Sequence, residues 1–189
     1  MAKRSWPPGN LLNPVPVVLI SCQGEQGPPN LLTVAWTGTV SSEPPMLSIS
    51  VRPERHSHRL IEETGEFVVN LPSERHVFAT DYCGVTSGRT VDKWAAMHLT
   101  PAPATSVRPP LVAECPVNLE CRVEQVLSLG SHDLFLARIV AVDVDEDLID
   151  PRGRLNLGKA GLVTYLHGEY WSLKKPLGRF GFSVRRKRK

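Results

Sequence analysis

The chain has 189 residues, 41% of them hydrophobic and 22% charged, with a formal net charge of +3. This balance predicts one globular domain with a sizeable core and excludes a disordered chain, and no apolar stretch has the length of a membrane span or the form of a signal peptide. The four cysteines contain no CxxC pair, so we expect reduced thiols in a cytoplasmic protein with no membrane contact.

The first third of the chain predicts mainly strands. Runs of β-branched or alternating residues, separated by turns rich in Gly and Pro, are interpreted as strands over 14–22, 31–40 and 46–52. Pro44 and Pro45 interrupt the ladder between the last two of these strands. A helix follows, with Ser57 as its N-cap and Gly65 as its C-terminal stop.

The rest of the chain predicts a hairpin-rich sheet with short helices between its strands. The predicted strands are 66–72, 117–130, 132–146 and two short pieces within 162–173, and the predicted helices are 74–84 and 92–98. The two long strands meet at the tight Gly130-Ser131 turn and therefore form a hairpin. Because strands and helices do not alternate regularly, we expect a mainly β protein, an antiparallel closed barrel whose gaps are filled by short helices.

The C-terminal end differs in charge from the rest of the chain. Residues 174–189 hold eight basic residues and no acid, whereas residues 1–173 carry 14 basic and 19 acidic side chains. We interpret 1–173 as a single domain and 174–189 as a basic tail. A solvated terminus is the default for such a run, and binding of nucleic acid or another anionic partner is the disfavoured alternative.

The turn before the first predicted helix carries a candidate phosphate site. A helix N-terminus offers free N–H groups and the positive end of the helix dipole, which favour an anion. Ser57 adds a hydroxyl, and Arg52 and Arg55 supply planar guanidinium groups that can hold phosphate oxygens in pairs. An ordinary serine cap with two solvated arginines is the alternative interpretation.

Four other positions are weaker candidates when each is taken alone. Lys93, in the run SGRTVDKW, could add a charge to the same phosphate, although a loop lysine is usually exposed to solvent. His132 starts a predicted strand at the hairpin turn, where a histidine is more often a surface residue. Trp36 and Tyr165 fall beside turns and could line an aromatic ligand, with core packing as the default.

Several other kinds of site are excluded. The aspartates of 143–147 alternate like the start of a calcium loop, but Leu148 stands where glycine is needed. His56 and His58 have no third ligand at a usual spacing, so we expect no metal site. The absence of a GxGxxG after a strand, of a P-loop and of a GxSxG elbow excludes the Rossmann, Walker and nucleophile-elbow sites.

Taken together, the motifs resemble a known family, the flavoredoxin branch of the flavin-reductase-like proteins. The resemblance extends over residues 14–173 and rests on four runs in order: PNLLTVAWTGTVSSEPP, SISVRPERHSHRLIEETGEFVVNLP, SGRTVDKW and LGSHDLFLARI. Proteins of this family are FMN-binding split β-barrels that form homodimers. The resemblance therefore implies that fold, FMN as cofactor, and a homodimer.

The resemblance also implies the roles of individual residues. In the family, matching positions contact the flavin, and here they are Asn30, Trp36, Thr37, Gly38 and Thr39 at the ring, Arg52, Arg55, Ser57 and Lys93 at the phosphate, His132 beside the flavin, and Tyr165 over part of the ring. Ser57 replaces a common threonine and keeps the hydroxyl. The family often has Arg-Tyr-Thr where this chain has Arg-His-Ser at 55–57, and the basic tail is outside the resemblance.

The expected function is that of an FMN-dependent oxidoreductase. FMN carries the redox chemistry, and His132 is the candidate catalytic residue beside it. Two activities stay open at this point, acceptance of hydride from NADH or NADPH and transfer of electrons between partner proteins. A non-enzymatic FMN carrier is one alternative. A flavin-free split barrel that binds an anionic partner through its basic tail is another.

Overall fold

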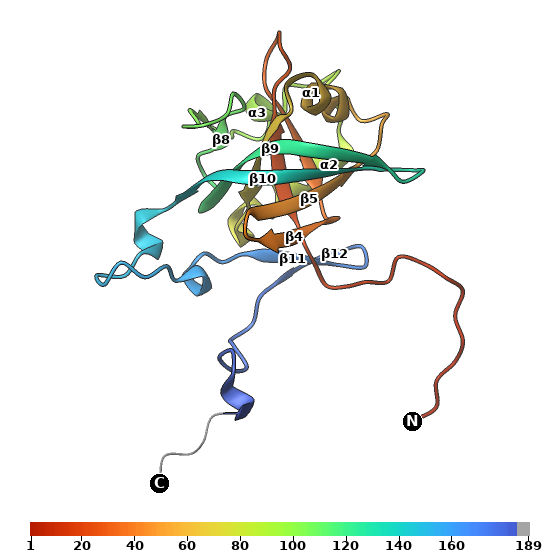
Figure 1. Cartoon of the computed structure of the whole chain (residues 1–189), viewed down its shortest axis with the longest axis vertical. Helices are drawn as coiled ribbons and strands as arrows, with labels where there is room; N and C mark the ends of the chain where they lie inside the picture. Colours follow the sequence, from red (N-terminus) through yellow and green to blue (C-terminus); the bar gives the residue numbers. More distant parts are fainter. Residues whose placement is uncertain (185–189) are drawn as a thin grey trace.

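The fold is known from a computed structural model that describes residues 1–184. A seven-stranded antiparallel sheet, in the order β3-β2-β6-β9-β10-β5-β4, curls into a barrel (Figure 1). Its strands are β2 (Val18–Cys22), β3 (Asn30–Val34), β4 (Thr37–Ser42), β5 (Pro45–Val51), β6 (Glu66–Leu71), β9 (Val117–Ser128) and β10 (Asp133–Val144). The mainly β, antiparallel fold class is confirmed. The hairpin of β9 and β10, with 12 residues in each strand, lies in the middle of the sheet.

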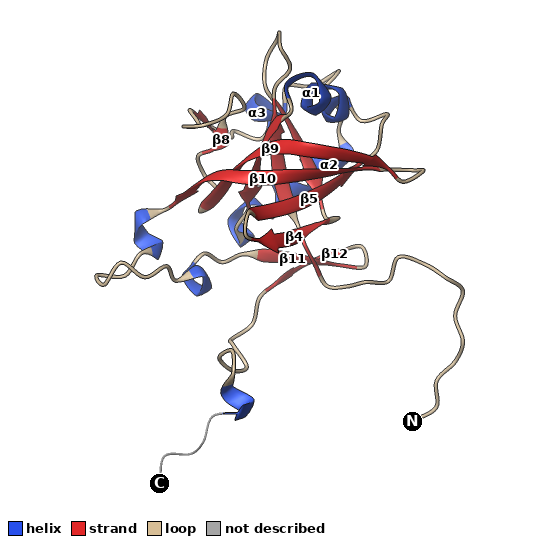
Figure 2. Cartoon of the chain, in the orientation of Figure 1, coloured by secondary structure: helices blue, strands red, loops and turns tan. Residues whose placement is uncertain are grey.

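Short helices and two small sheets complete the fold (Figure 2). The helices are α1 (His56–Thr64), α2 (Val77–Val85) and α3 (Lys93–Ala96), with 3-10 turns at η1 (Glu74–His76), η2 (Glu146–Leu148), η3 (Leu157–Lys159) and η4 (Phe182–Val184). The small sheets are formed by β1 (Val15–Pro16), β11 (Val163–Leu166) and β12 (Glu169–Ser172), and by β7 (Pro101–Ala102) and β8 (Leu111–Val112). Within residues 1–184, no helix is long and apolar enough to cross a membrane.

Alternation along the strands produces two cores on opposite faces of the sheet. Ile20, Ile49, Phe67 and Phe135 belong to the interior cluster and are fully buried. Neighbouring positions such as Leu19 point the other way, into a second cluster that the helices cover. This second cluster fixes α2 and α3 against β2 and β3, so these helices have a defined position relative to the sheet.

The barrel is split rather than closed by a continuous ladder, which corrects one detail of the prediction. Within the described residues the order of hydrogen-bonded strands ends at β3 and at β4. The predicted single strand over 31–40 is in fact these two strands, with a bend at residues 35–36. The Ser50 amide donates to the Trp36 carbonyl at 2.9 Å, so the bend is anchored on β5.

Two local predictions were wrong. The N-cap of α1 is Arg55, which makes no side-chain capping bond, and Ser57 lies inside the first turn. The hairpin between β9 and β10 has a four-residue turn, 129–132, closed by a bond from the Leu129 amide to the His132 carbonyl, so His132 precedes the strand. The strand predicted over 14–22 is also divided, into β1 and β2, which belong to different sheets. The other predicted elements are present with shifted ends, and residues 185–189 of the predicted basic tail lie outside the described part of the chain.

Candidate functional site

A polar cavity of about 520 Å³ lies where β3, the turn before α1 and the loop after α2 meet, and we call it the basic cavity. It is lined by Asn30, Leu32, Arg52, Glu54, Arg55, His56, Ser57, Thr86, Ser87, Gly88 and Lys93. Five of these residues, Asn30, Arg52, Arg55, Ser57 and Lys93, are predicted site residues. The structure therefore brings the whole predicted phosphate group together, although Lys93 lies 36 residues after Ser57 in the sequence.

The floor of the basic cavity is a buried hydrogen bond. The Asn30 side-chain amide donates to the Ser57 hydroxyl at 2.8 Å, and the two residues are 7% and 1% exposed. This bond gives the physical reason why Ser57 does not cap α1, because its oxygen is held by β3. The Ser57 hydroxyl retains its own hydrogen as a donor, and the N–H groups of the first turn of α1 have no side-chain cap.

Lys93 is the most unusual residue of the basic cavity, since its side chain is buried at 2% exposure. Its ammonium donates to the Leu31 carbonyl at 2.7 Å and to the Cys83 carbonyl at 2.8 Å. Burial lowers the pKa of Lys93, while the two carbonyls hold the protonated form in place. An ammonium has three donors, so one N–H remains for a ligand in the cavity.

The loop after α2 closes the cavity by a close backbone approach. A Cβ on Gly88 would lie 2.0 Å from the Asn30 Oδ1 atom, so only glycine fits above the Asn30 amide. The same loop leads to Asp92, which caps α3 by accepting from the Trp94 and Ala95 amides at 3.0 and 3.2 Å. The cap sets the start of α3 and thereby the position of Lys93.

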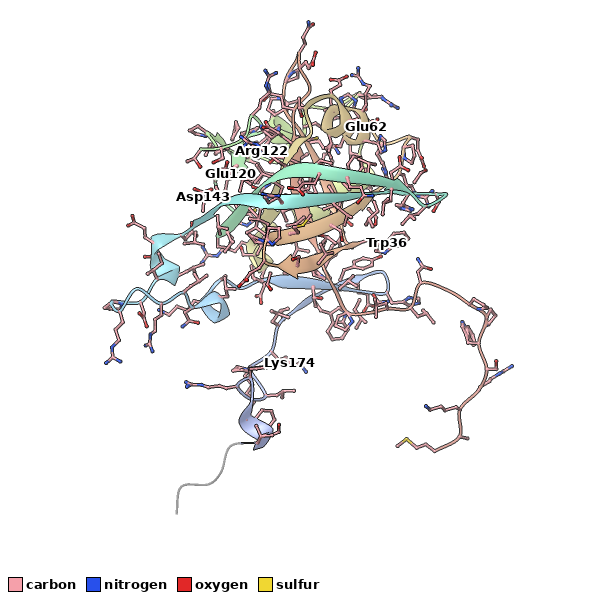
Figure 3. All side chains as sticks on the ribbon, viewed as in Figure 1. Trp36, Glu62, Glu120, Arg122, Asp143 and Lys174 are labelled. Carbon is pink, nitrogen blue, oxygen red and sulfur yellow. The ribbon has the colours of Figure 1, made fainter. Side chains whose placement is uncertain are left out.

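A second cavity of about 220 Å³ adjoins the first and shares Leu32, Arg52 and Arg55 with it. We call it the aromatic cavity, and its lining also includes Thr33, Val34, Ala35, Trp36, Ser50, Val51, His132 and Tyr165. The rings of Trp36 and His132 lie 4.5 Å apart between centroids, at an angle of 45°. Trp36, labelled in Figure 3, directly precedes β4.

The charge state of His132 follows from its surroundings. Partial burial, with the nearby Arg52 guanidinium second, lowers the pKa of His132. Its Nδ1 atom lies 2.9 Å from the Ser131 hydroxyl in the same turn. The lowered pKa of His132 favours the neutral ring at neutral pH, and this ring lines the aromatic cavity.

The remaining predicted ring contacts lie apart from these two cavities. Thr37, Gly38 and Thr39 line a groove of about 440 Å³ on the other side of Trp36, together with Leu12 and residues of β5. Trp36 is thus the boundary between the aromatic cavity and this β4 groove. The structure does not place these three residues in one cavity with His132 and Tyr165.

Some residues of the basic cavity had no predicted role. His56 lines it, and burial, followed by the charges of Arg89 and Arg59, lowers the pKa of its imidazole. Thr86 and Ser87 contribute hydroxyls to the rim. The run SGRTVDKW marks this loop in the sequence, but spacing alone does not show that its glycine approaches Asn30.

The cysteines do not offer a nucleophile. All four are buried and free, and burial raises the pKa of Cys22 and Cys121 to about 12 and that of Cys83 to about 11. Thiols this weakly acidic stay protonated at neutral pH. Redox chemistry at this site therefore calls for a bound group rather than for a protein thiolate.

A comparison with protein families shows the family of this chain. The model of a family described as "Flavin reductase like domain" matches residues 11–173. The NADH-dependent flavin reductase StyB of Pseudomonas fluorescens is 29% identical over 133 residues, which are 69% of this chain and 72% of that protein.

Solved structures agree with this sequence relationship. The flavoredoxin of Desulfovibrio vulgaris (Miyazaki F) matches with a TM-score of 0.91 and 30% identity, over 97% of this chain and all of that one. An FMN-binding protein from Thermus thermophilus, solved with bound 1-cyclohex-2-enone, matches with a TM-score of 0.75 and 27% identity, over 91% and 95% of the two chains. The fold is therefore that of the flavin-reductase-like split β-barrels.

Proposed function

We propose that this chain, which belongs to the flavin reductase-like family, is an FMN-binding oxidoreductase. The observation that carries the proposal is the junction of the two cavities. One is polar and cationic and suits a phosphate, the other is flanked by Trp36, His132 and Tyr165 and suits a flat ring, and both share Arg52 and Arg55.

The basic cavity would hold the FMN phosphate. The third N–H of Lys93, the Ser57 hydroxyl and the guanidinium of Arg55 can all donate to phosphate oxygens, and charge-assisted bonds of this kind are the strong ones. The uncapped first turn of α1 adds backbone donors and the helix dipole. Glu54 is the acid of this lining, and it pairs with Arg52 at 3.5 Å, so its charge is offset.

The aromatic cavity and the β4 groove would hold the flavin ring. Bound FMN would supply the redox chemistry, while the chain supplies binding, orientation and electrostatics. Trp36 and Tyr165 offer apolar surface, and His132 offers a ring nitrogen toward the cavity. Thr37, Gly38 and Thr39, which line the β4 groove, would supply the other predicted contacts to the ring.

Two electron donors fit this proposal, a nicotinamide nucleotide and a redox partner protein. The similarity to an NADH-dependent flavin reductase favours the nicotinamide. The test uses purified protein reconstituted with FMN. A yellow protein with the absorbance bands of oxidised flavin supports FMN binding, and anaerobic bleaching by NADH or NADPH supports the enzyme. Bleaching only by a protein donor or by dithionite would favour an electron carrier, and a colourless protein would favour a flavin-free barrel whose basic tail binds an anionic partner.

We further propose a cytoplasmic homodimer with FMN near the subunit interface. Trp36 and Val40 are 44% and 51% exposed beside the β4 groove, and Leu12 is 88% exposed at its rim, so apolar surface surrounds the expected ring position. A second copy would cover it. The four buried free thiols agree with a reducing compartment. A monomer by light scattering at micromolar concentration, still holding FMN, would contradict the dimer.

A further inference from the structure

We propose that His58 is a positioning residue, a buried imidazolium that fixes the first turn of α1 against β10 and so sets the phosphate-binding turn relative to His132. This inference rests on the proposed FMN function. His58 lines neither cavity, and it follows Ser57 directly, while its partner Asp133 follows His132. The contact therefore joins the two ends of the site through neighbours of the predicted ligands.

The ring of His58 lies between two carboxylates, which favours its charged form. The His58 Nε2 atom lies 2.7 Å from the Asp133 carboxylate, and the Nδ1 atom lies 3.2 Å from the Glu62 carboxylate on the next turn of α1. A neutral imidazole carries one N–H, so its other nitrogen would present a lone pair to a carboxylate. The Nε2 contact with Asp133 is a hydrogen bond, and the Nδ1 contact with Glu62 is an ion pair by distance. Only the imidazolium presents an N–H to both carboxylates. Within the described residues, Glu62 and Asp133 are the charged groups in contact with the ring.

Burial makes this contact matter more than a surface ion pair. The His58 side chain is 7% exposed and that of Asp133 is 13% exposed. The His58 and Phe135 rings pack edge to face, with their centroids 5.2 Å apart. The second Asp133 oxygen, Oδ1, is buried without a hydrogen-bond partner within residues 1–184. Removing His58 would take away the hydrogen bond to Asp133 Oδ2 and leave Ser128 as the remaining partner of that carboxylate, and α1 would lose its polar contact with β10.

A metal site is the rival explanation for the same three residues. Ligand atoms of His58, Glu62 and Asp133 all lie within 4.8 Å of one another. However, an ion needs one deprotonated ring nitrogen that faces both carboxylates, and here the carboxylates lie at opposite nitrogens. Glu62 is also half exposed on the outer side of α1 (Figure 3). The arrangement therefore favours an ion-pair clamp.

The first experiment reads the protonation of the ring in full-length, flavin-free protein. In a ¹⁵N-labelled sample at pH 7.5, we expect both His58 ring nitrogens to carry protons, with His58→Gln used for assignment. The signals should not change with EDTA or with one equivalent of Zn²⁺. A neutral ring, or a nitrogen that shifts on adding Zn²⁺, would overturn the clamp. This result does not depend on FMN, so it stands or fails separately from the proposed function.

The second experiment tests positioning with FMN and riboflavin, which differ in the phosphate. We expect His58→Gln, and Asp133→Asn as the milder variant should the first fail to fold, to weaken FMN binding by about tenfold. Riboflavin affinity should change by less than twofold, because riboflavin does not use the phosphate turn. A purely structural role would lower the melting temperature and leave the ratio of the two affinities unchanged, which would overturn the proposal.

The matched control lies one residue away on the same helix. Glu63 pairs with Arg59 at 2.9 Å in the same i,i+4 spacing as Glu62 and His58, but that pair does not contact β10. Glu63→Gln should keep the affinity ratio of FMN to riboflavin, whereas Glu62→Gln should lower it by two- to threefold. Equal effects of the two substitutions on this ratio would mean that any loss of charge on α1 changes it. That result would contradict a specific role of the His58 ion pairs. If the unmodified protein binds no FMN, the proposed function fails and only the NMR result bears on His58.

Discussion

The basic cavity and the aromatic cavity share two arginines but are built in different ways. In the basic cavity, Asn30, Ser57 and Lys93 are each at most 7% exposed and are held by buried hydrogen bonds. In the aromatic cavity, Trp36 is 44% exposed, and His132 lies in a hairpin turn with Ser131 as its partner.

This difference indicates how the site is organised. The basic cavity, the proposed phosphate end, is preformed by the protein core, and a ligand that binds there meets donors already in place, which reduces the cost of ordering them. The aromatic cavity, the proposed ring end, is formed by the bend at residues 35–36 and the turn at residues 129–132. Apolar side chains beside it are exposed to solvent. We therefore expect changes at the phosphate end to alter affinity and changes at the ring end to alter reactivity.

The largest effect should come from Lys93→Met. A hydrogen bond to a charged group contributes about 1.5–3 kcal/mol, so FMN binding should weaken by about ten- to a hundredfold. The carbonyls of Leu31 and Cys83 would also lose their donor in the core, and the melting temperature should fall. Quenching of FMN fluorescence gives the affinity, and calorimetry gives the stability.

The control for Lys93 is an exposed lysine outside the cavities. Lys174→Met removes the same charge from the start of the basic tail and should change neither quantity. Riboflavin should bind the unmodified protein poorly and be little affected by Lys93→Met. Equal affinity of the unmodified protein for FMN and riboflavin would contradict the assignment of the basic cavity to phosphate.

The next largest effect should come from Gly88→Ala, which tests the shape of the basic cavity rather than its charge. The new methyl would meet the Asn30 amide at 2.0 Å, so either the loop or Asn30 must move. Overpacking of this kind costs about 1–3 kcal/mol, and FMN affinity should fall together with stability. Gly9→Ala, where nothing lies within 4 Å, is the matched control. Unchanged FMN binding in Gly88→Ala would show that the loop does not border the ligand.

A smaller effect is expected from Arg52→Ala, because this guanidinium is 49% exposed and already pairs with Glu54. FMN affinity should fall by about tenfold at low ionic strength and by less at high salt, since exposed charges are screened. Arg59→Ala, on α1 outside both cavities, serves as control. An affinity loss that does not vary with salt would place Arg52 in direct, buried contact with the phosphate.

Sequence patterns predicted the fold better than the contacts of the site. The strand alternation and the helix stop at Gly65 are local, and the structure has them. The role of Ser57 depends on Asn30, 27 residues away, and the burial of Lys93 depends on the Leu31 carbonyl, 62 residues away. Local propensity predicts a cap from a serine before a helix and exposure from a lysine in a loop. It does not include contacts between residues that are distant in the sequence. The residues alone suggested a shared phosphate for Arg52, Ser57 and Lys93, and the resemblance to a family added FMN and the expected ring contacts.

The smallest effect on binding, and the sharpest contrast with Lys93, is expected for His132→Ala. His132 lies against Trp36 in the aromatic cavity and is absent from the lining of the basic cavity. FMN affinity should therefore change by less than about threefold, because the phosphate contacts stay intact. The reduction potential of the bound flavin, measured by anaerobic titration below the lowered pKa of His132, should fall, since a protonated imidazole favours the additional negative charge of the reduced ring.

The pH dependence of that potential separates an electrostatic role of His132 from a packing role. The pKa of His132 is lowered by burial and by Arg52, so the ring is largely neutral at pH 7.5 and gains its proton as the pH falls. The gap in potential between the unmodified protein and His132→Ala should consequently widen on acidification through that pKa. In a packing role the gap would be constant with pH, and His132→Phe would restore the original potential. Equal potentials and equal rates of reduction by NADH or NADPH in all three proteins would exclude His132 from the redox chemistry and leave it as a turn residue.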